Sequence, residues 1–209
     1  MKFGKTRAYA RNVFINCPFD PEFDPIFEAI VFTVFACGFR PVCARQRLNS
    51  AEVRLEKILS LIGDSRLSIH DLSRTQPDAD TGNPRFNMPF ELGLDLGCRS
   101  FHSRYADKHA LIFGEKKYEY QKFLSDIAGQ DVHDHQNGVA KAIAGVRNFL
   151  AAQNPDNPVS GPARILKRYE EFRAALPRIL NEVGIEPDEM QFTDLAWAAK
   201  QWMETVPET

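Results

Sequence analysis

The sequence predicts an α/β fold, a three-layer sandwich built on a mostly parallel sheet of five strands and followed by C-terminal helices. Short apolar runs alternate with longer amphipathic segments from the N-terminus onward, which is typical of β-α units stacked on a parallel sheet. The chain has 209 residues, of which 44% are hydrophobic, enough to bury one sizeable core. We therefore expect one α/β domain over residues 1–152 and a helical extension over residues 153–209.

The expected strands are short runs rich in apolar residues. N-V-F-I-N at 12–16 is the first, and three prolines in the segment after it exclude helix until about Pro25. The other expected strands are R-P-V-C-A (40–44), R-L-S-I-H-D-L (66–72), K-H-A-L-I-F-G (108–114) and the short Q-D-V-H-D-H (130–135).

Helices are expected between and after these strands. Pro25 suits a first helical turn, so the first helix should cover 25–37 and end at Gly38. The last two expected helices, 163–183 and 188–204, could form a lid, a small subdomain or a dimer surface. The remaining expected helices are 50–63, 85–97, 120–129, 139–152, 163–183 and 188–204.

Charge and cysteine content exclude several classes of protein. The formal net charge is −2, so no overall positive charge points to a nucleic-acid partner, although Lys2, Lys5, Arg7 and Arg11 make the N-terminus locally basic. The four cysteines form no C-x-x-C pair, which fits a reducing compartment. The first residues lack the apolar centre of a signal peptide, and no apolar run approaches the roughly 18 residues of a membrane span. We expect a cytoplasmic protein with neither a membrane nor a nucleic-acid partner.

The fold class also predicts where a ligand binds. In an open parallel sheet, ligands bind beyond the carboxyl ends of the strands, where the strand order reverses. In a flavodoxin-like order the first and third strands flank this crevice, so the loops after them border it. The predicted lining residues are Asn16, Cys17, Asp20, Asp71 and Ser73.

One carboxylate, Glu91, interrupts the apolar start of the helix expected after the third strand. With Asn87 as N-cap, Glu91 lies beside the helix N-terminus, where the dipole favours its ionised form. It could hold ribose hydroxyls, support positive charge at an anomeric carbon or attack that carbon. The alternative is an ordinary acidic residue of a first turn, without a substrate. Two observations favour chemistry: Asp95 repeats an acid one turn on, and Gly93 and Gly97, each roughly 1 kcal/mol less helix-favouring than Ala, indicate close packing.

Three segments carry a resemblance to known families. V-F-I-N-C-P-F-D at the first strand, S-I-H-D-L-S at the third and N-M-P-F-E-L-G-L-D-L-G in the next helix resemble bacterial TIR-like proteins and the related nucleoside 2-deoxyribosyltransferases. The resemblance covers roughly residues 12–136 and implies a flavodoxin-like fold. Members of both families use a glutamate at the start of the helix after the third strand, and Glu91 matches that position.

The resemblance implies chemistry on an N-glycosidic bond. TIR enzymes cleave the nicotinamide–ribose bond of NAD, as glycohydrolases or as cyclase-type signal synthases, and the transferases use the glutamate as a nucleophile on deoxyribose. NAD is then the expected substrate or ligand, with no metal. A role in antiphage defence, a homo-oligomer and an effector protein acting downstream are also implied.

Two alternatives to a NAD-cleaving enzyme stay open. The usual Trp-Cys pair of TIR enzymes is replaced by Met88-Pro89, which favours a non-catalytic nucleotide-binding signalling or scaffold module. The other alternative is a nucleoside 2-deoxyribosyltransferase, although its typical Asp-Gly-Thr approach is missing.

Further side chains are expected at the crevice. Phe19, in a proline-rich loop, can stack on a base or nicotinamide ring, and Asn87 lies at the start of the Glu91 helix. Arg45 follows the second strand, in the loop that lies over the nucleotide in the resembling TIR proteins, and contacts a phosphate or is solvated. Cys17 has no neighbouring base to activate its thiol and is interpreted as a lining or packing residue.

The run D-V-H-D-H at 131–135 places two imidazoles and two carboxylates within five residues. In a strand, His133 and His135 would share one face, which permits a metal site. No third ligand of suitable spacing is evident, so we expect a polar strand end near the crevice instead, with His135 available to line the pocket.

Overall fold

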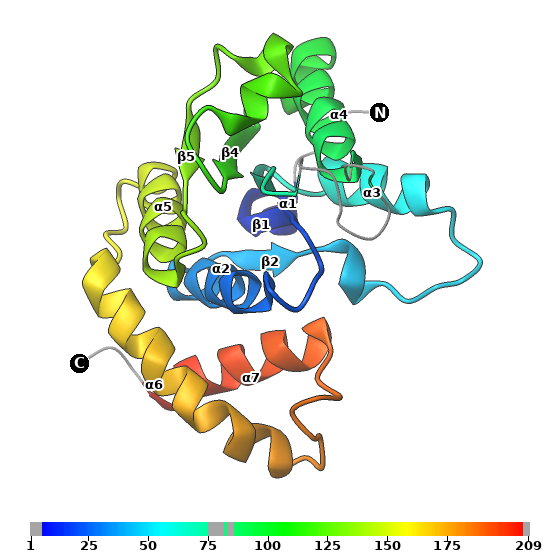
Figure 1. Ribbon diagram of the computed structural model, residues 1–209. Helices are drawn as coiled ribbons and strands as arrows, with labels where there is room; N and C mark the ends of the chain where they lie inside the picture. The colour runs from blue at the N-terminus through cyan, green and yellow to red at the C-terminus, as the bar shows by residue number, and fades with distance from the viewer. Residues whose placement is uncertain (1–5, 75–81, 83–85, 207–209) are drawn as a thin grey trace.

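The computed structural model describes residues 6–74, 82 and 86–206 and contains one parallel sheet of five strands (Figure 1). The strand order is β2-β1-β3-β4-β5, with every neighbouring pair parallel. This is the flavodoxin-like order that the sequence predicts. The strands are β1 (Asn12–Asn16), β2 (Arg40–Val42), β3 (Leu67–Asp71), β4 (His109–Gly114) and β5 (Val132–Asp134).

Burial of the two central strands on both faces explains their continuous apolar sequences. Every residue of β1 and β3 is buried. On one face, Val13 and Ile15 pack in the same cluster as α2 (Asp24–Ala36) and α5 (Val139–Ala152). On the other face, Phe14 packs with α3 (Arg54–Gly63) and α4 (Asn87–Phe101). The three predicted layers are therefore present.

The C-terminal helices add a further layer outside α2. In Figure 1, α6 (Pro162–Asn181) and α7 (Phe192–Thr205) lie below α2, on the side away from the sheet. The Phe32 ring of α2 is stacked on Phe172, with centroids 5.2 Å apart, and contacts Trp202 at 5.7 Å. All residues from Ile26 to Val34 are buried, because α2 is covered on both sides. Residues 153–209 were predicted only as a helical extension, and their described helices share the core of the α/β domain.

Some predicted elements differ from the structure. Residues 120–129 were predicted as one helix, but form two short 3₁₀ turns, η3 (Glu119–Lys122) and η4 (Ser125–Ile127). Tyr118 has a positive φ of 64° just before them, and Ser and Asp residues within the segment favour turns over a continuing helix. An additional short helix, α1 (Arg7–Arg11), is capped by the Thr6 hydroxyl, which accepts from the Tyr9 N–H.

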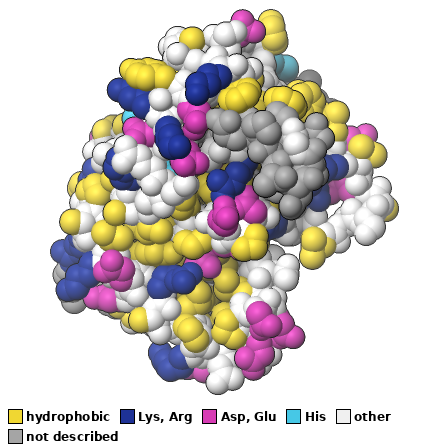
Figure 2. Space-filling model, in the orientation of Figure 1, with side chains coloured by type: hydrophobic (Ala, Val, Ile, Leu, Met, Phe, Trp, Pro, Cys, Tyr) yellow, Lys and Arg dark blue, Asp and Glu magenta, His cyan; other side chains and the backbone are white. Residues whose placement is uncertain are grey.

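Charges of both signs are interspersed on the face of the molecule in Figure 2, with hydrophobic side chains between them. This mixture agrees with the net charge of −2. Within the described residues, no helix is both long and apolar enough to cross a lipid bilayer. The polar loop predicted between β3 and α4 lies almost entirely outside those residues, as does Arg85.

Candidate functional site

A small pocket of about 130 Å³ lies beyond the carboxyl end of β1. Its walls come from the end of β1 and the loop after it, from the first turns of α4, from the start of α3 and from η1 (Ala44–Gln46). Five of the nine residues predicted for the site line this pocket, whereas Asp20, Arg45, Asp71 and Ser73 do not. The lining residues are Phe14, Ile15, Asn16, Cys17, Pro18, Phe19, Ala44, Arg54, Asn87, Met88 and Glu91.

Glu91 lies in the pocket wall with 8% of its surface exposed. Burial raises the pKa of this carboxyl group, and the Arg54 guanidinium, 3.9 Å away, partly opposes that rise. A buried carboxylate with one cationic neighbour favours any further positive charge placed beside it. The pocket therefore offers an acidic group that is shielded from bulk water.

The predicted position of Glu91 within its helix was wrong. Asn87 is the first helical residue rather than the N-cap, Phe86 occupies the cap position, and no side chain caps the helix. Glu91 is consequently in the second turn, where the helix dipole has less effect. Its pKa is raised by burial, whereas the sequence argument expected the dipole to favour ionisation.

The expectation that Gly93 and Gly97 mark close packing was also wrong. A Cβ added to Gly93 would meet no atom within 4 Å, and one added to Gly97 would only touch the Phe101 ring at 3.7 Å. Close packing occurs instead at Gly145 of α5, where a Cβ would lie 2.7 Å from the Phe113 ring of β4.

Asn16 holds the start of α4 against the sheet. Its Nδ2 donates to the Met88 carbonyl at 3.0 Å and lies 3.0 Å from His70 Nδ1. Because a carbonyl only accepts, the Asn16 amide must be oriented with its NH₂ group towards Met88. The same NH₂ group faces His70, so His70 Nδ1 must be the acceptor. The His70 proton is therefore on Nε2, which lies 3.0 Å from Asp95 Oδ2.

Behind His70, Asp95 anchors a buried polar network. Lys108 Nζ lies 3.0 Å from Asp95 Oδ1 and donates to the carbonyls of Ile62 and Ser65, while the Ser68 hydroxyl donates to Asp95 Oδ2. Burial alone would raise the pKa of Asp95, but His70, Lys108 and Ser68 outweigh it and lower that pKa to about 2. The network fixes α4 relative to β3, and so fixes the wall that carries Glu91.

Asp71 and Ser73 form a separate buried cluster with His135. His135 Nε2 lies 2.9 Å from Asp71 Oδ2 and 2.8 Å from the Ser73 hydroxyl, and its Nδ1 accepts from the Asn137 N–H. Asp71 also accepts from the Ser73 N–H at 2.8 Å. His70 and Asp71 point to opposite faces of β3, because side chains alternate along a strand.

His133 does not join His135. Its ring is half exposed and lies 3.7 Å from Asp131, whereas His135 is fully buried. His135 packs edge-on against the rings of Phe23 and Phe113, and it does not line the pocket. The two imidazoles of the D-V-H-D-H run therefore occupy different environments.

Two other side chains predicted to contact a ligand, Asp20 and Arg45, interact with neighbouring side chains of the protein. Both carboxylate oxygens of Asp20 accept from Arg74 at 3.1 Å. The Arg45 guanidinium lies over the Phe19 ring, 4.2 Å from its centroid, and pairs with Asp24 at 3.6 Å. Phe19 lines the pocket and Arg45 covers its ring, so these two side chains form one stacked unit.

Cys17 lines the pocket as a neutral thiol. The side chain is buried, and this burial raises its pKa well above the ordinary value for cysteine. A thiol that stays protonated is a poor nucleophile, which agrees with its interpretation as a lining residue.

Sequence reasoning missed four residues that shape the site: Arg54, Ser68, His70 and Lys108. The alternation of Ser68 and His70 on one strand face was a usable signal, as was the spacing of Glu91 and Asp95 by one helical turn. Arg54 pairs with Glu91 and Lys108 with Asp95. The partners in each pair are distant in sequence, so no local pattern predicts these contacts. Comparison with protein-family models and with curated proteins produced no match for this chain.

Proposed function

We propose that this chain is a TIR-like enzyme that cleaves the N-glycosidic bond between nicotinamide and ribose in NAD, with Glu91 as the catalytic carboxylate. The observation that carries the proposal is the placement of Glu91 in the wall of the pocket beyond β1, buried and with a raised pKa. The resemblance of the segments around β1, β3 and α4 to TIR-like proteins supports the same reading, including a role in antiphage defence.

The chemistry follows from the charge that bond cleavage creates. Departure of nicotinamide leaves positive charge on the anomeric carbon and ring oxygen of the ribose. A carboxylate in a poorly hydrated wall interacts strongly with such charge, because little water competes with it. The contacts of Asn16 with His70 and Met88 both use its Nδ2, so Oδ1 is the atom that can accept from a ribose hydroxyl.

The pocket volume limits what enters it. At about 130 Å³ it is smaller than the roughly 300 Å³ or more of a typical ligand site. We therefore place one ring of the nucleotide next to Glu91, with the remainder over the pocket rim. The Phe19 ring, stacked beneath Arg45, is positioned in that wall for an aromatic contact with the nicotinamide.

A second candidate is a non-catalytic nucleotide-binding signalling or scaffold module. The Arg54–Glu91 pair favours it, because a guanidinium 3.9 Å from the carboxylate occupies the position that a substrate cation would take. In such a module Glu91 would fix α3 against α4, and nucleotide would raise the melting temperature without being changed.

The test is mass spectrometry of NAD incubated with the protein over a range of protein concentrations, since activity in a homo-oligomer depends on assembly. We expect release of nicotinamide with ADP-ribose or a cyclised product. Glu91→Gln keeps the side-chain volume and should reduce the rate by about 10²–10³-fold, as expected for loss of one electrostatic group. Glu56→Gln, at an exposed carboxylate of α3, is the matched control and should leave the rate unchanged.

The remaining outcomes separate the candidates. Intact NAD combined with a nucleotide-dependent rise in melting temperature would establish the binding module and rule out the enzyme. Exchange of bases between deoxynucleosides, abolished by Glu91→Gln, would identify a nucleoside 2-deoxyribosyltransferase instead.

A further inference from the structure

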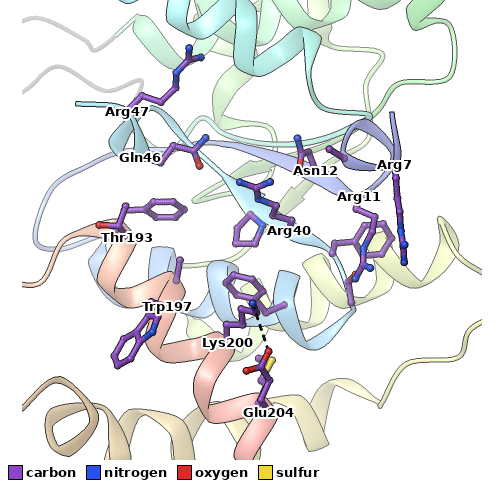
Figure 3. Close-up of a pocket in the computed structure, with 18 residues that line it drawn as sticks. Arg7, Arg11, Asn12, Arg40, Gln46, Arg47, Thr193, Trp197, Lys200 and Glu204 are labelled. Carbon is purple, nitrogen blue, oxygen red and sulfur yellow. Dashed lines mark hydrogen bonds and ion pairs between the residues drawn. The ribbon is translucent and has the colours of Figure 1, made fainter. Parts of the chain in front are cut away.

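A groove of about 1100 Å³ runs between the N-terminal helix α1, the edge strand β2 and the C-terminal helix α7. Figure 3 shows the side chains that these three elements place along it, with Arg40 in the middle, Arg7 and Arg11 at one end and Trp197 at the other. Arg40 opens β2 and Asn12 opens β1, so the groove includes the amino ends of these strands, whereas the Glu91 pocket lies beyond the carboxyl end of β1. The groove shares no lining residue with that pocket.

The groove is lined by cations. Five of its residues are basic, namely Arg7, Arg11, Arg40, Arg47 and Lys200. Lys200 pairs at 3.7 Å with Glu204, the one acidic residue among the described residues of the lining, and Arg47 pairs at 3.0 Å with Glu52 outside it. Arg7 and Arg40 are exposed and make no ion pair within the part of the chain that the structure describes. Guanidinium groups left without carboxylates in a concave surface create a positive potential that attracts anions.

The basic surface continues beyond the groove. A neighbouring hollow of about 420 Å³, which is also lined by Asp64, shares Arg40 and Arg47 with it, and another of about 670 Å³ shares Arg7 and Arg11. The cations are thus distributed along three adjoining hollows, and in Figure 3 they are spread out instead of converging on one point. A chain with regularly spaced negative charges matches this arrangement better than a single phosphate or a compact ligand does.

An aromatic platform accompanies the cations. The Trp197 side chain on α7 lines the groove and is 40% exposed, whereas Phe39 and Phe192, which also line it, are buried. Gln46 and Thr193 add uncharged hydrogen-bonding groups. Cations that track a backbone, together with an exposed aromatic ring on which a base can stack, are the features that bind single-stranded nucleic acid.

We propose that this groove binds a short single-stranded nucleic acid, with its phosphates on Arg7, Arg11 and Arg40 and one base stacked on Trp197. The proposal does not depend on the function of Glu91, since the two sites share no residue. The net charge of −2 gave no reason to predict a nucleic-acid partner. Net charge is a sum over the whole chain, so it carries no information about a local cluster of cations that the fold brings together.

The test is fluorescence anisotropy of the full chain with fluorescein-labelled dT12 and rU12, at several salt concentrations. Contacts to three or four phosphates predict that log K falls with log salt at a slope of about −2 to −3. Arg40→Glu should weaken binding by at least about tenfold and make the slope shallower by about 0.7. Arg164→Glu, at an exposed arginine of α6 outside the groove, is the matched control and should bind like the parent chain.

Trp197 supplies a second, independent readout. Trp197→Ala should weaken binding by about 5- to 100-fold without changing the salt slope, because stacking releases no counterions. Binding should also quench tryptophan fluorescence, and Trp197→Phe should abolish the quenching because the other tryptophan, Trp202, is buried.

Three results would overturn the proposal. The first is absence of binding to both oligonucleotides at 50 mM salt while the circular dichroism spectrum shows a folded chain. The second is equal affinity for dT12 and for polyglutamate of matched charge, which would indicate an acidic protein partner. The third is equal affinity for dTMP and dT12, which would indicate a compact nucleotide site. The relative affinities for dT12 and rU12 show whether the groove prefers DNA or RNA.

Discussion

Asn16 and His70 lie on neighbouring strands with Asn16 Nδ2 3.0 Å from His70 Nδ1, and this contact joins the candidate pocket to a charged network behind it. From His70 the network passes to Asp95 and ends at Lys108, which is only 2% exposed. Its members come from β1, β3, α4 and the residue before β4. The pocket wall is therefore held by buried polar contacts, and these make specific predictions.

Acid should weaken the fold through Asp95. Its pKa is about 2 in the folded protein against an ordinary 3.8, so the carboxylate contributes stability above pH 4 that is lost as the pH falls towards 2. A shift of this size corresponds to about 2 kcal/mol of unfolding free energy. Urea unfolding at pH 5, 4, 3 and 2 should show the loss, and Asp95→Asn should lack that part of the pH dependence. The same acid dependence in both proteins would contradict the assignment.

Lys108→Met should be strongly destabilising. Removing the ammonium group leaves Asp95 buried without its ion pair, which typically costs about 3–5 kcal/mol. Urea denaturation of Lys108→Met, Asp95→Asn and the double variant gives the coupling between the two groups. The double variant should lose less unfolding free energy than the two single variants together, because it removes both charges. Simple additivity would show that the pair is not coupled.

Two glycine substitutions should have opposite effects. Gly93→Ala adds a methyl group into open space within α4, so helix propensity should stabilise the protein by up to about 1 kcal/mol. Gly145→Ala brings a methyl group 2.7 Å from the buried Phe113 ring and should destabilise by about 1–3 kcal/mol. Thermal unfolding of the two variants checks both signs in one experiment. A stabilised Gly145→Ala would mean that α5 can move away from β4 without loss.

Glu91→Gln should stabilise the protein at neutral pH. Because the pKa of Glu91 is raised in the folded state, its ionisation opposes folding once the pH exceeds the unfolded-state value. The melting temperature of Glu91→Gln should therefore exceed that of the parent chain at pH 7, and the difference should shrink as the pH falls below about 4.5. A lower melting temperature at pH 7 would show that the Arg54 pair outweighs burial.

The strand order and the position of the pocket could be predicted from the sequence, for identifiable reasons. β1 and β3 are continuous apolar runs followed by polar loops, and α2 is apolar all round, which indicates burial on both sides. The rule for open parallel sheets then places the pocket beyond β1, where Asn16, Cys17 and Phe19 line it.

The errors at the site come from side-chain direction and helix register. Asp71 was assigned to the pocket because it ends β3, but His70 faces the α3 and α4 layer and Asp71 faces away from it. A one-residue shift in the start of α4 moved Glu91 from the first turn to the second. The basic groove depends on α1, β2 and α7 meeting in space, and contacts between segments so distant in sequence follow from no local pattern.

The packing of Phe32 against Phe172 has a consequence for biosynthesis. These rings belong to helices near opposite ends of the chain, so α2 leaves the ribosome long before the helix that covers its outer side. Until α6 and α7 arrive, a nascent chain exposes an apolar helix face, which is the surface that chaperones recognise and that aggregates form from. The packing of α2 is therefore completed only after α6 and α7 have been synthesised, and a chain truncated at about residue 152 should be insoluble.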